Sequence, residues 1–200
     1  MTRDKLAPDP IYTFWPGNLA PTHFTPGDFL LTRTRFHWRD PGTIDGLLIG
    51  AGQRLRHSKQ YSWPTHAALV VSRDGDLIEA KSKGVVKGHA SEYQPLDYYL
   101  VQPEYNQEGG WGYARDVRRS DALFFANEML GTKYGWFTDV SLGLSFLTGS
   151  KLLFERSGTV ICSGFVAAAV GTAQWRADPS HVCPADLAAQ YKVNFREVSG

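Results

Sequence analysis

The chain has 200 residues, of which 21 are basic and 20 acidic, with 42% hydrophobic and 20% charged residues. This length fits one domain and can bury a core without disulfide or metal staples. The balanced charge argues against broad binding to nucleic acid or to an anionic membrane surface, which needs a basic excess. The composition is that of an ordinary globular protein.

The beginning of the chain is rich in proline and glycine. Residues 1–26 predict an irregular arm laid over residues 27–200, which we expect to form a single domain. The stretch Met1–Pro10 carries charges and lacks the apolar run of a signal peptide. We therefore expect a cytoplasmic protein, or one exported by a route that needs no signal peptide.

The predicted strands are short aliphatic and β-branched runs. They cover residues 29–32, 66–72, 77–81, 85–87 and 98–102, with a possible edge strand at 193–198. Asp74-Gly75 is a strong hairpin-turn signal between the second and third of these strands. We expect an antiparallel sheet of about five strands, which is a usual number.

The predicted helices follow from apolar residues at helical spacing and from residues typical of helix ends. They cover 44–56 after the cap Thr43, 117–130 before Gly131, a buried helix from near Cys162 to Gly171, and 184–190 beginning at Pro184. Helices that bracket a run of strands are typical of the α+β class.

The most apolar stretch of the chain is residues 136–154, which Asp139 and Lys151 interrupt. A membrane-spanning helix needs about 20 mainly apolar residues, so we expect no integral membrane segment. Core packing is the favoured interpretation of this stretch. The wall of an acyl or peptide groove is the alternative.

Cys162 stands where an apolar helix is predicted to begin. The positive end of a helix dipole favours the thiolate, which is the nucleophilic form. Backbone N–H groups at the same end can receive an oxyanion during acyl transfer. His66 begins a hydrophobic strand, and Glu79 lies on the return strand of the same hairpin. A nucleophile, a histidine and an orienting carboxylate together predict covalent catalysis.

Each of these residues alone has a plainer interpretation. Free cysteine is among the most commonly buried residues, and a histidine or glutamate on a strand is often a surface residue. The hairpin register is a further difficulty, because a two-residue turn would pair Val70 with Glu79. His66 would then lie about 13 Å further along, at about 3.3 Å per residue. Glu79 reaches His66 only if a bulge, curvature or a wider turn shifts the pairing.

The hairpin sequence resembles the histidine hairpin of NlpC-type papain-like hydrolases. The similarity lies in Thr65–Val71, in Asp74-Gly75 and in Leu77–Ala80, where a polar residue precedes a small one. The hairpin precedes the cysteine helix, as in the permuted branch with bacterial NlpC-like hydrolases and lecithin:retinol acyltransferase-like proteins. Shorter similarities are Gly27–Thr32, Gly84-Val85, Tyr134-Gly135, Cys162-Ser163 and Pro184–Leu187.

The resemblance implies a permuted papain-like (NlpC-type) α+β fold, with the nucleophile helix packed against the sheet. Cys162 would be the nucleophile, His66 the base and Glu79 the third member of the triad. Glu79 is assigned from the resemblance and not from the hairpin register. Tyr61 and Ser163 are candidate neighbours of the oxyanion or substrate. No metal and no organic cofactor is required.

Two features depart from the pattern of this family. Gly164 stands where an acidic residue often follows the Cys-Ser pair, and Trp63-Pro64 makes an unusual loop beside His66. These departures affect possible contacts around the nucleophile and the base.

The expected function is a cysteine hydrolase, an amidase or peptidase that works through a thioester. The expected partner is a small peptide, amide or acyl substrate, with cell-wall peptides as one possibility. The alternatives are a lipid or small-amide acyltransferase or esterase of the same fold, and a non-catalytic binding module. The oligomeric state does not follow from the sequence.

Other candidate sites rank lower. His181 and Cys183 are too close in sequence to point at one another, and Pro184 makes Cys183 a residue of helix entry. Two cysteines cannot form a Cys-rich zinc site, and a disulfide between them would silence Cys162.

The remaining histidines have no partner at a suitable spacing and are interpreted as surface residues; they are His23, His37, His57 and His89. Gly109-Gly110 is interpreted as a loop, since it lacks the strand–helix context of a phosphate site.

Overall fold

The structure is a computed structural model. It describes residues 11–33, 50–51, 53–54, 57–103, 119–134, 159–170 and 182–193. Several predictions lie outside these ranges: the segment 136–154, the strand 193–198 apart from its first residue, Gly109-Gly110, His37 and His181. Of the predicted helix 44–56, residues 50, 51, 53 and 54 are described and helical.

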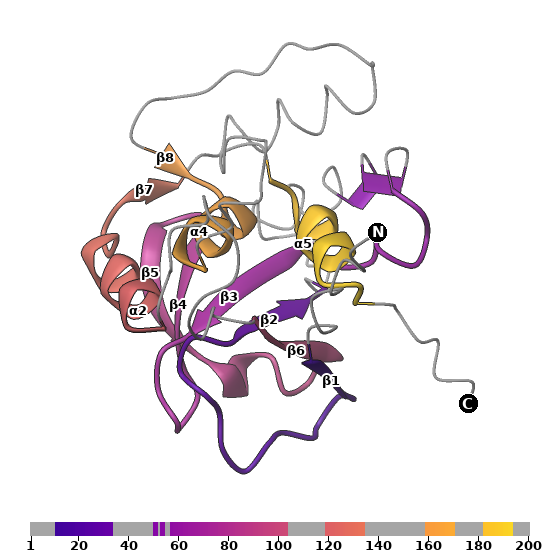
Figure 1. The fold of residues 1–200 in the computed structure, drawn as a ribbon, viewed down its shortest axis with the longest axis horizontal. Helices are drawn as coiled ribbons and strands as arrows, with labels where there is room; N and C mark the ends of the chain where they lie inside the picture. Colours follow the sequence, from indigo (N-terminus) through magenta and orange to yellow (C-terminus); the bar gives the residue numbers. More distant parts are fainter. Residues whose placement is uncertain are drawn as a thin grey trace, which may run out of the picture.

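In the described parts of the chain, six strands form one antiparallel sheet in the order β1-β6-β2-β3-β4-β5 (Figure 1). Their bounds are Ile11–Trp15 for β1, Phe29–Thr32 for β2, His66–Val70 for β3, Asp76–Lys81 for β4, Gly84–His89 for β5 and Tyr98–Gln102 for β6. The five strands predicted within residues 29–102 are confirmed, with small differences at their ends.

The sixth strand, β1, corrects the prediction of an irregular arm over residues 1–26 and adds one strand to the expected sheet of about five. β1 pairs with β6 and forms one edge of the sheet. Its Tyr12 and Phe14 rings lie 5.8 and 4.9 Å from the Tyr99 ring of β6. These cross-strand aromatic contacts stabilise the pairing, although the surrounding prolines and glycines suggested no regular structure.

Besides the helical residues 50, 51, 53 and 54, three α-helices with described bounds accompany the sheet, which confirms the α+β class. They are α2 (Arg119–Glu128), α4 (Cys162–Ala169) and α5 (Pro184–Gln190). A 3-10 helix, η1 (Ala90–Glu92), follows β5, and a short parallel pair joins β7 (Lys133–Tyr134) to β8 (Thr159–Val160). Gly131 adopts the positive φ of 82° after α2, which is the predicted role of a glycine at a helix C-terminus.

The sheet is buried on both faces, so its central strands are almost continuously apolar. Ala67 and Leu69 of β3 belong to the cluster shared with α4 and α5, while Ala68 and Val70 belong to a second cluster. This alternation follows from the two-residue period of a strand. Helices α4 and α5 pack over the first face (Figure 1), and Phe24 and the η1 region cover the second.

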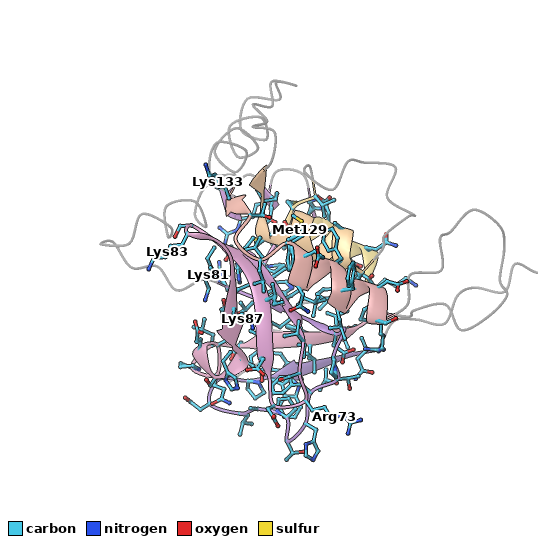
Figure 2. All side chains as sticks on the ribbon, turned by 90° about the vertical axis from the view of Figure 1, so that its left-hand side faces the viewer. Arg73, Lys81, Lys83, Lys87, Met129 and Lys133 are labelled. Carbon is cyan, nitrogen blue, oxygen red and sulfur yellow. The ribbon has the colours of Figure 1, made fainter. Side chains whose placement is uncertain are left out.

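One side of the molecule presents the edge strand β5 and several basic residues. Lys83 and Lys87, together with Lys133 of β7, lie along this side (Figure 2).

In the described parts of the chain, no helix combines the length and hydrophobicity needed to cross a membrane.

Candidate functional site

His66 and Glu79 form a buried pair in the sheet. The Nε2 atom of His66 lies 2.7 Å from Oε2 of Glu79. The Glu79 side chain is fully buried, and that of His66 is 13% exposed. The carboxylate therefore orients the imidazole directly.

The hairpin register explains how Glu79 reaches His66. The predicted pairing of Val70 with Glu79 is wrong, because Val70 pairs with Leu77 and Leu69 with Ile78. A bond from Val71 N–H to the Asp76 carbonyl (2.8 Å) closes a wider turn over residues 72–75. This shift of two residues moves Glu79 closer to His66 by about 7 Å, at about 3.3 Å per residue.

Cys162 is the first residue of α4, as predicted. Helix α4 packs on β3 and β4, and Cys162 lies close enough to His66 to raise the pKa of the imidazole. The first N–H groups of a helix have no acceptor within the helix, so they remain suited to an oxyanion. The structure thus brings Cys162, His66 and Glu79 together, although Cys162 is only 2% exposed.

The charged groups of this site shift one another's pKa values toward the charged forms. Burial alone would lower the pKa of His66, but the hydrogen bonds and negative charges of Cys162 and Glu79 outweigh it and raise this pKa to about 10. Burial would likewise raise the pKa of Glu79, but His66, Lys81 and Tyr93 together lower it to about 2. At neutral pH the site therefore holds an imidazolium beside a carboxylate.

Tyr93 and Lys81 complete the surroundings of Glu79, and the sequence analysis missed both. The Tyr93 hydroxyl donates to Oε2 of Glu79, and its ring stacks on His66 with centroids 5.7 Å apart. Lys81 Nζ lies 2.7 Å from Oε1 of Glu79 and 2.9 Å from Oε2 of Glu92. The two-residue strand period places Lys81 on the Glu79 face, but no sequence pattern marks Tyr93.

Gly88 of β5 leaves the space that the Glu79 carboxylate fills. A Cβ atom at position 88 would overlap Oε1 of Glu79. A side chain there would displace the carboxylate, since such a contact is far inside van der Waals distance.

The two lower-ranked site candidates have structural contacts. Tyr61 is partly buried and packs against the core cluster that includes Cys162. Ser163 is fully buried, and its hydroxyl donates to the Val182 carbonyl at 2.6 Å. This bond ties α4 to the residues that precede α5. The expected positions of Tyr61 and Ser163 beside an oxyanion or substrate stay predictions.

His57 is not the partnerless surface residue that the sequence analysis expected. Its Nε2 atom lies 3.0 Å from Oδ1 of Asp186 and 3.9 Å from Sγ of Cys183. Cys183 is the N-cap of α5, as its helix-entry position predicted. Burial and the Asp186 carboxylate raise the pKa of the Cys183 thiol. The partners of His57 lie far along the chain, which is why spacing did not reveal them.

No family model matches the chain, and comparisons with curated proteins and with solved structures give no match.

Proposed function

We propose that the protein is a cysteine hydrolase with a permuted papain-like fold, acting on amide or ester bonds. The observation that carries this proposal is one imidazole, that of His66, which is bonded to a buried carboxylate and whose pKa is raised by a cysteine at a helix N-terminus. A lone buried cysteine would need neither partner. The fold proposal is supported by chain order, since the β3–β4 hairpin precedes α4 and packs against it.

In the proposed reaction, the proton of Cys162 already resides on His66, and the thiolate attacks the substrate carbonyl. N–H groups of the first α4 turn stabilise the tetrahedral oxyanion. The His66 imidazolium then gives its proton to the leaving amine or alcohol, and a thioester with Cys162 remains. His66 next takes a proton from water, and the resulting hydroxide attacks the thioester. The acid leaves, and Cys162 is again a thiolate beside the protonated His66.

Glu79 holds the imidazole in the orientation that both steps require. Its negative charge stabilises the imidazolium that forms when Cys162 loses its proton. Tyr93 and Lys81 in turn hold the carboxylate. This arrangement requires no metal and no organic cofactor, and the expected substrates are peptides, small amides or acyl esters.

The first test is alkylation of the full chain by iodoacetamide at pH 7, with both cysteines followed by mass spectrometry. We expect Cys162 to react faster than free cysteine, whose pKa of about 8.5 leaves it mostly protonated. Buried Cys183 serves as the internal reference. His66→Ala should slow the reaction of Cys162, whereas His23→Ala, at an exposed position, should not. A Cys162 no faster than free cysteine would contradict the proposal.

The second test is a screen of peptidoglycan fragments, small amides and acyl esters. We expect the active substrates of the wild type to lose turnover in Cys162→Ala, with a loss of at least about 10³-fold. His23→Ala is again the control. Activity that survives unchanged in Cys162→Ala would remove the mechanism.

A further inference from the structure

Three metal-ligating side chains converge at the N-terminus of α5, outside the site described above. His57 Nε2, Cys183 Sγ and a carboxylate oxygen of Asp186 all lie within 4.8 Å of one another. Cys183 is buried, while the side chains of His57 and Asp186 are 15% and 13% exposed. The cluster is therefore sheltered but reachable from the His57 side.

The geometry distinguishes this cluster from a second catalytic triad. In a triad the histidine uses one ring nitrogen for the nucleophile and the other for the carboxylate. Here the same atom, Nε2 of His57, faces both Asp186 Oδ1 at 3.0 Å and Cys183 Sγ at 3.9 Å. Convergence of three donor atoms on one point is the arrangement of a ligand set.

The spacing of the donor atoms also fits a metal ion. Tetrahedral zinc has bonds of about 2.0 Å to nitrogen and oxygen and about 2.3 Å to sulfur, which place its ligand atoms about 3.3–3.6 Å apart. The two distances from His57 Nε2 fall on either side of this range. Shifts of a few tenths of an ångström would bring these two distances into the range, and all three ligand atoms lie within 4.8 Å of one another.

The protein holds these ligands in place by bonds of its own. The Cys183 backbone N–H donates to Asp186 Oδ2 at 2.8 Å, which orients the carboxylate. The side chain of buried Gln53 accepts a hydrogen bond from the Ala185 N–H and donates one to the Pro64 carbonyl. The backbone carbonyl of Gln53 accepts a hydrogen bond from the His57 N–H. The segment with His57 is thus fastened to the start of α5, which lowers the ordering cost of binding.

We propose that His57, Cys183 and Asp186 bind one divalent cation of the zinc type. Cys183 coordinates as a thiolate after its proton passes to solvent, His57 through Nε2 and Asp186 through Oδ1. This mixed sulfur, nitrogen and oxygen set suits Zn²⁺ and Co²⁺ better than Mg²⁺ or Ca²⁺, which prefer oxygen alone. Three protein ligands leave the fourth tetrahedral position to water. The ion crosslinks α5 to the His57 segment and does not depend on the proposed hydrolase activity.

The test uses the full chain, freed of metal by a chelator and titrated with Co²⁺ alone. We expect a thiolate-to-cobalt charge-transfer band in the near ultraviolet, saturating at one ion per chain and displaced by Zn²⁺. The band should persist in Cys162→Ala and vanish in Cys183→Ala. Because Cys183 is buried, His57→Gln is the second variant, and it should weaken cobalt binding at least about 10-fold.

The two cysteine variants distinguish a metal ion bound at Cys183 from one bound at Cys162. Absence of a thiolate band in the wild type would overturn the metal proposal. A band that disappears in Cys162→Ala and persists in Cys183→Ala would overturn it as well, because it would place the ion at the Cys162–His66 pair. The hydrolase proposal is tested separately, by alkylation of Cys162 in metal-free protein.

Discussion

The Tyr93 hydroxyl and the His66 imidazole meet the same oxygen of Glu79. Burial and the charge of Glu79 raise the pKa of Tyr93, so the hydroxyl remains a donor. The tyrosine thus limits the rotation of the carboxylate and supports the His66 ring by stacking. We assign Tyr93 a positioning role, since its hydroxyl bonds to Glu79 and its ring stacks on His66.

Tyr93→Phe should lower the free energy of unfolding by about 1.5–3 kcal/mol, the value of a hydrogen bond to a charged group. Tyr98→Phe is the matched control, because within the described residues the buried Tyr98 hydroxyl has no hydrogen-bond partner. That variant should be neutral or slightly stabilising. Urea unfolding measures both, and equal losses in the two variants would argue against the bond to Glu79.

The raised pKa of His66 makes stability depend on alkaline pH. In the unfolded chain the pKa of histidine is about 6.5, whereas in the folded chain that of His66 is about 10. The folded state therefore binds more protons between these values, and its stability falls as pH rises through them. Below pH 6.5 the contribution is fully present.

We expect the free energy of unfolding of the wild type to fall more steeply between pH 6.5 and 10 than that of His66→Gln. Other groups that titrate in this range are shared by both proteins, so the difference between the slopes isolates His66. Urea unfolding across this range measures it. Parallel curves would mean that His66 is not charged in the folded protein.

Glu79, whose pKa is lowered to about 2, adds stability that is lost as pH falls from about 4.5.

At the scale of elements, an ion pair joins α2 to the beginning of β2. Arg119 Nη1 lies 2.8 Å from Asp28 Oδ1 and donates to the Pro26 carbonyl at the same distance. The Asp28 side chain is fully buried, and that of Arg119 is 37% exposed. Burial raises the pKa of Asp28 to about 6, although Arg119 acts in the opposite direction. At neutral pH the carboxylate is charged and depends on the guanidinium.

Arg119→Gln should lower the free energy of unfolding by about 1–3 kcal/mol at pH 7.5. This is less than the cost of breaking a fully buried pair, because Arg119 is partly exposed to solvent. The loss should shrink at pH 5, where Asp28 takes up a proton. Arg73→Gln, at an exposed position, is the control. A loss of the same size at both pH values would show that Arg119 acts through packing and its bond to the Pro26 carbonyl, and not through the charge of Asp28.

At the scale of the whole molecule, strand β5 forms an edge that the protein protects against pairing with another chain. Near one end, Val85 exchanges hydrogen bonds with Gly131 and Thr132. Near the other, the His89 N–H donates to Glu92 at 3.2 Å. Between them stands the exposed Lys87 (Figure 2). A lysine on an edge strand opposes the addition of a further strand.

Lys87→Val should increase self-association, because it removes the charge and adds a good strand former at the centre of this edge. We expect the mass measured by light scattering to rise with protein concentration toward that of a dimer. Lys59→Val, at an exposed turn position, carries the same chemical change away from the sheet and should not. Identical behaviour of the two variants would show that β5 does not control association.

The sequence by itself determined the strands within residues 29–102 and the helices α2, α4 and α5. Their signals are local: apolar periodicity, the turn at Asp74-Gly75, Pro184 at a helix start and Gly131 after a helix end. It also placed Cys162 at the start of α4, because the apolar run of that helix begins there. Its main local errors were β1 and the hairpin register, since a Pro/Gly-rich arm and an Asp-Gly turn each allow more than one conformation.

Only the tertiary structure decided which side chains meet. A shift of two residues in the β3–β4 register changes whether Glu79 can touch His66, and this register depends on burying the correct face of the sheet. Tyr93 reaches Glu79 from a loop, and His57 meets Cys183 across 126 positions of sequence. Such contacts depend on how whole elements pack together, because the residues that form them carry no periodic signal along the chain.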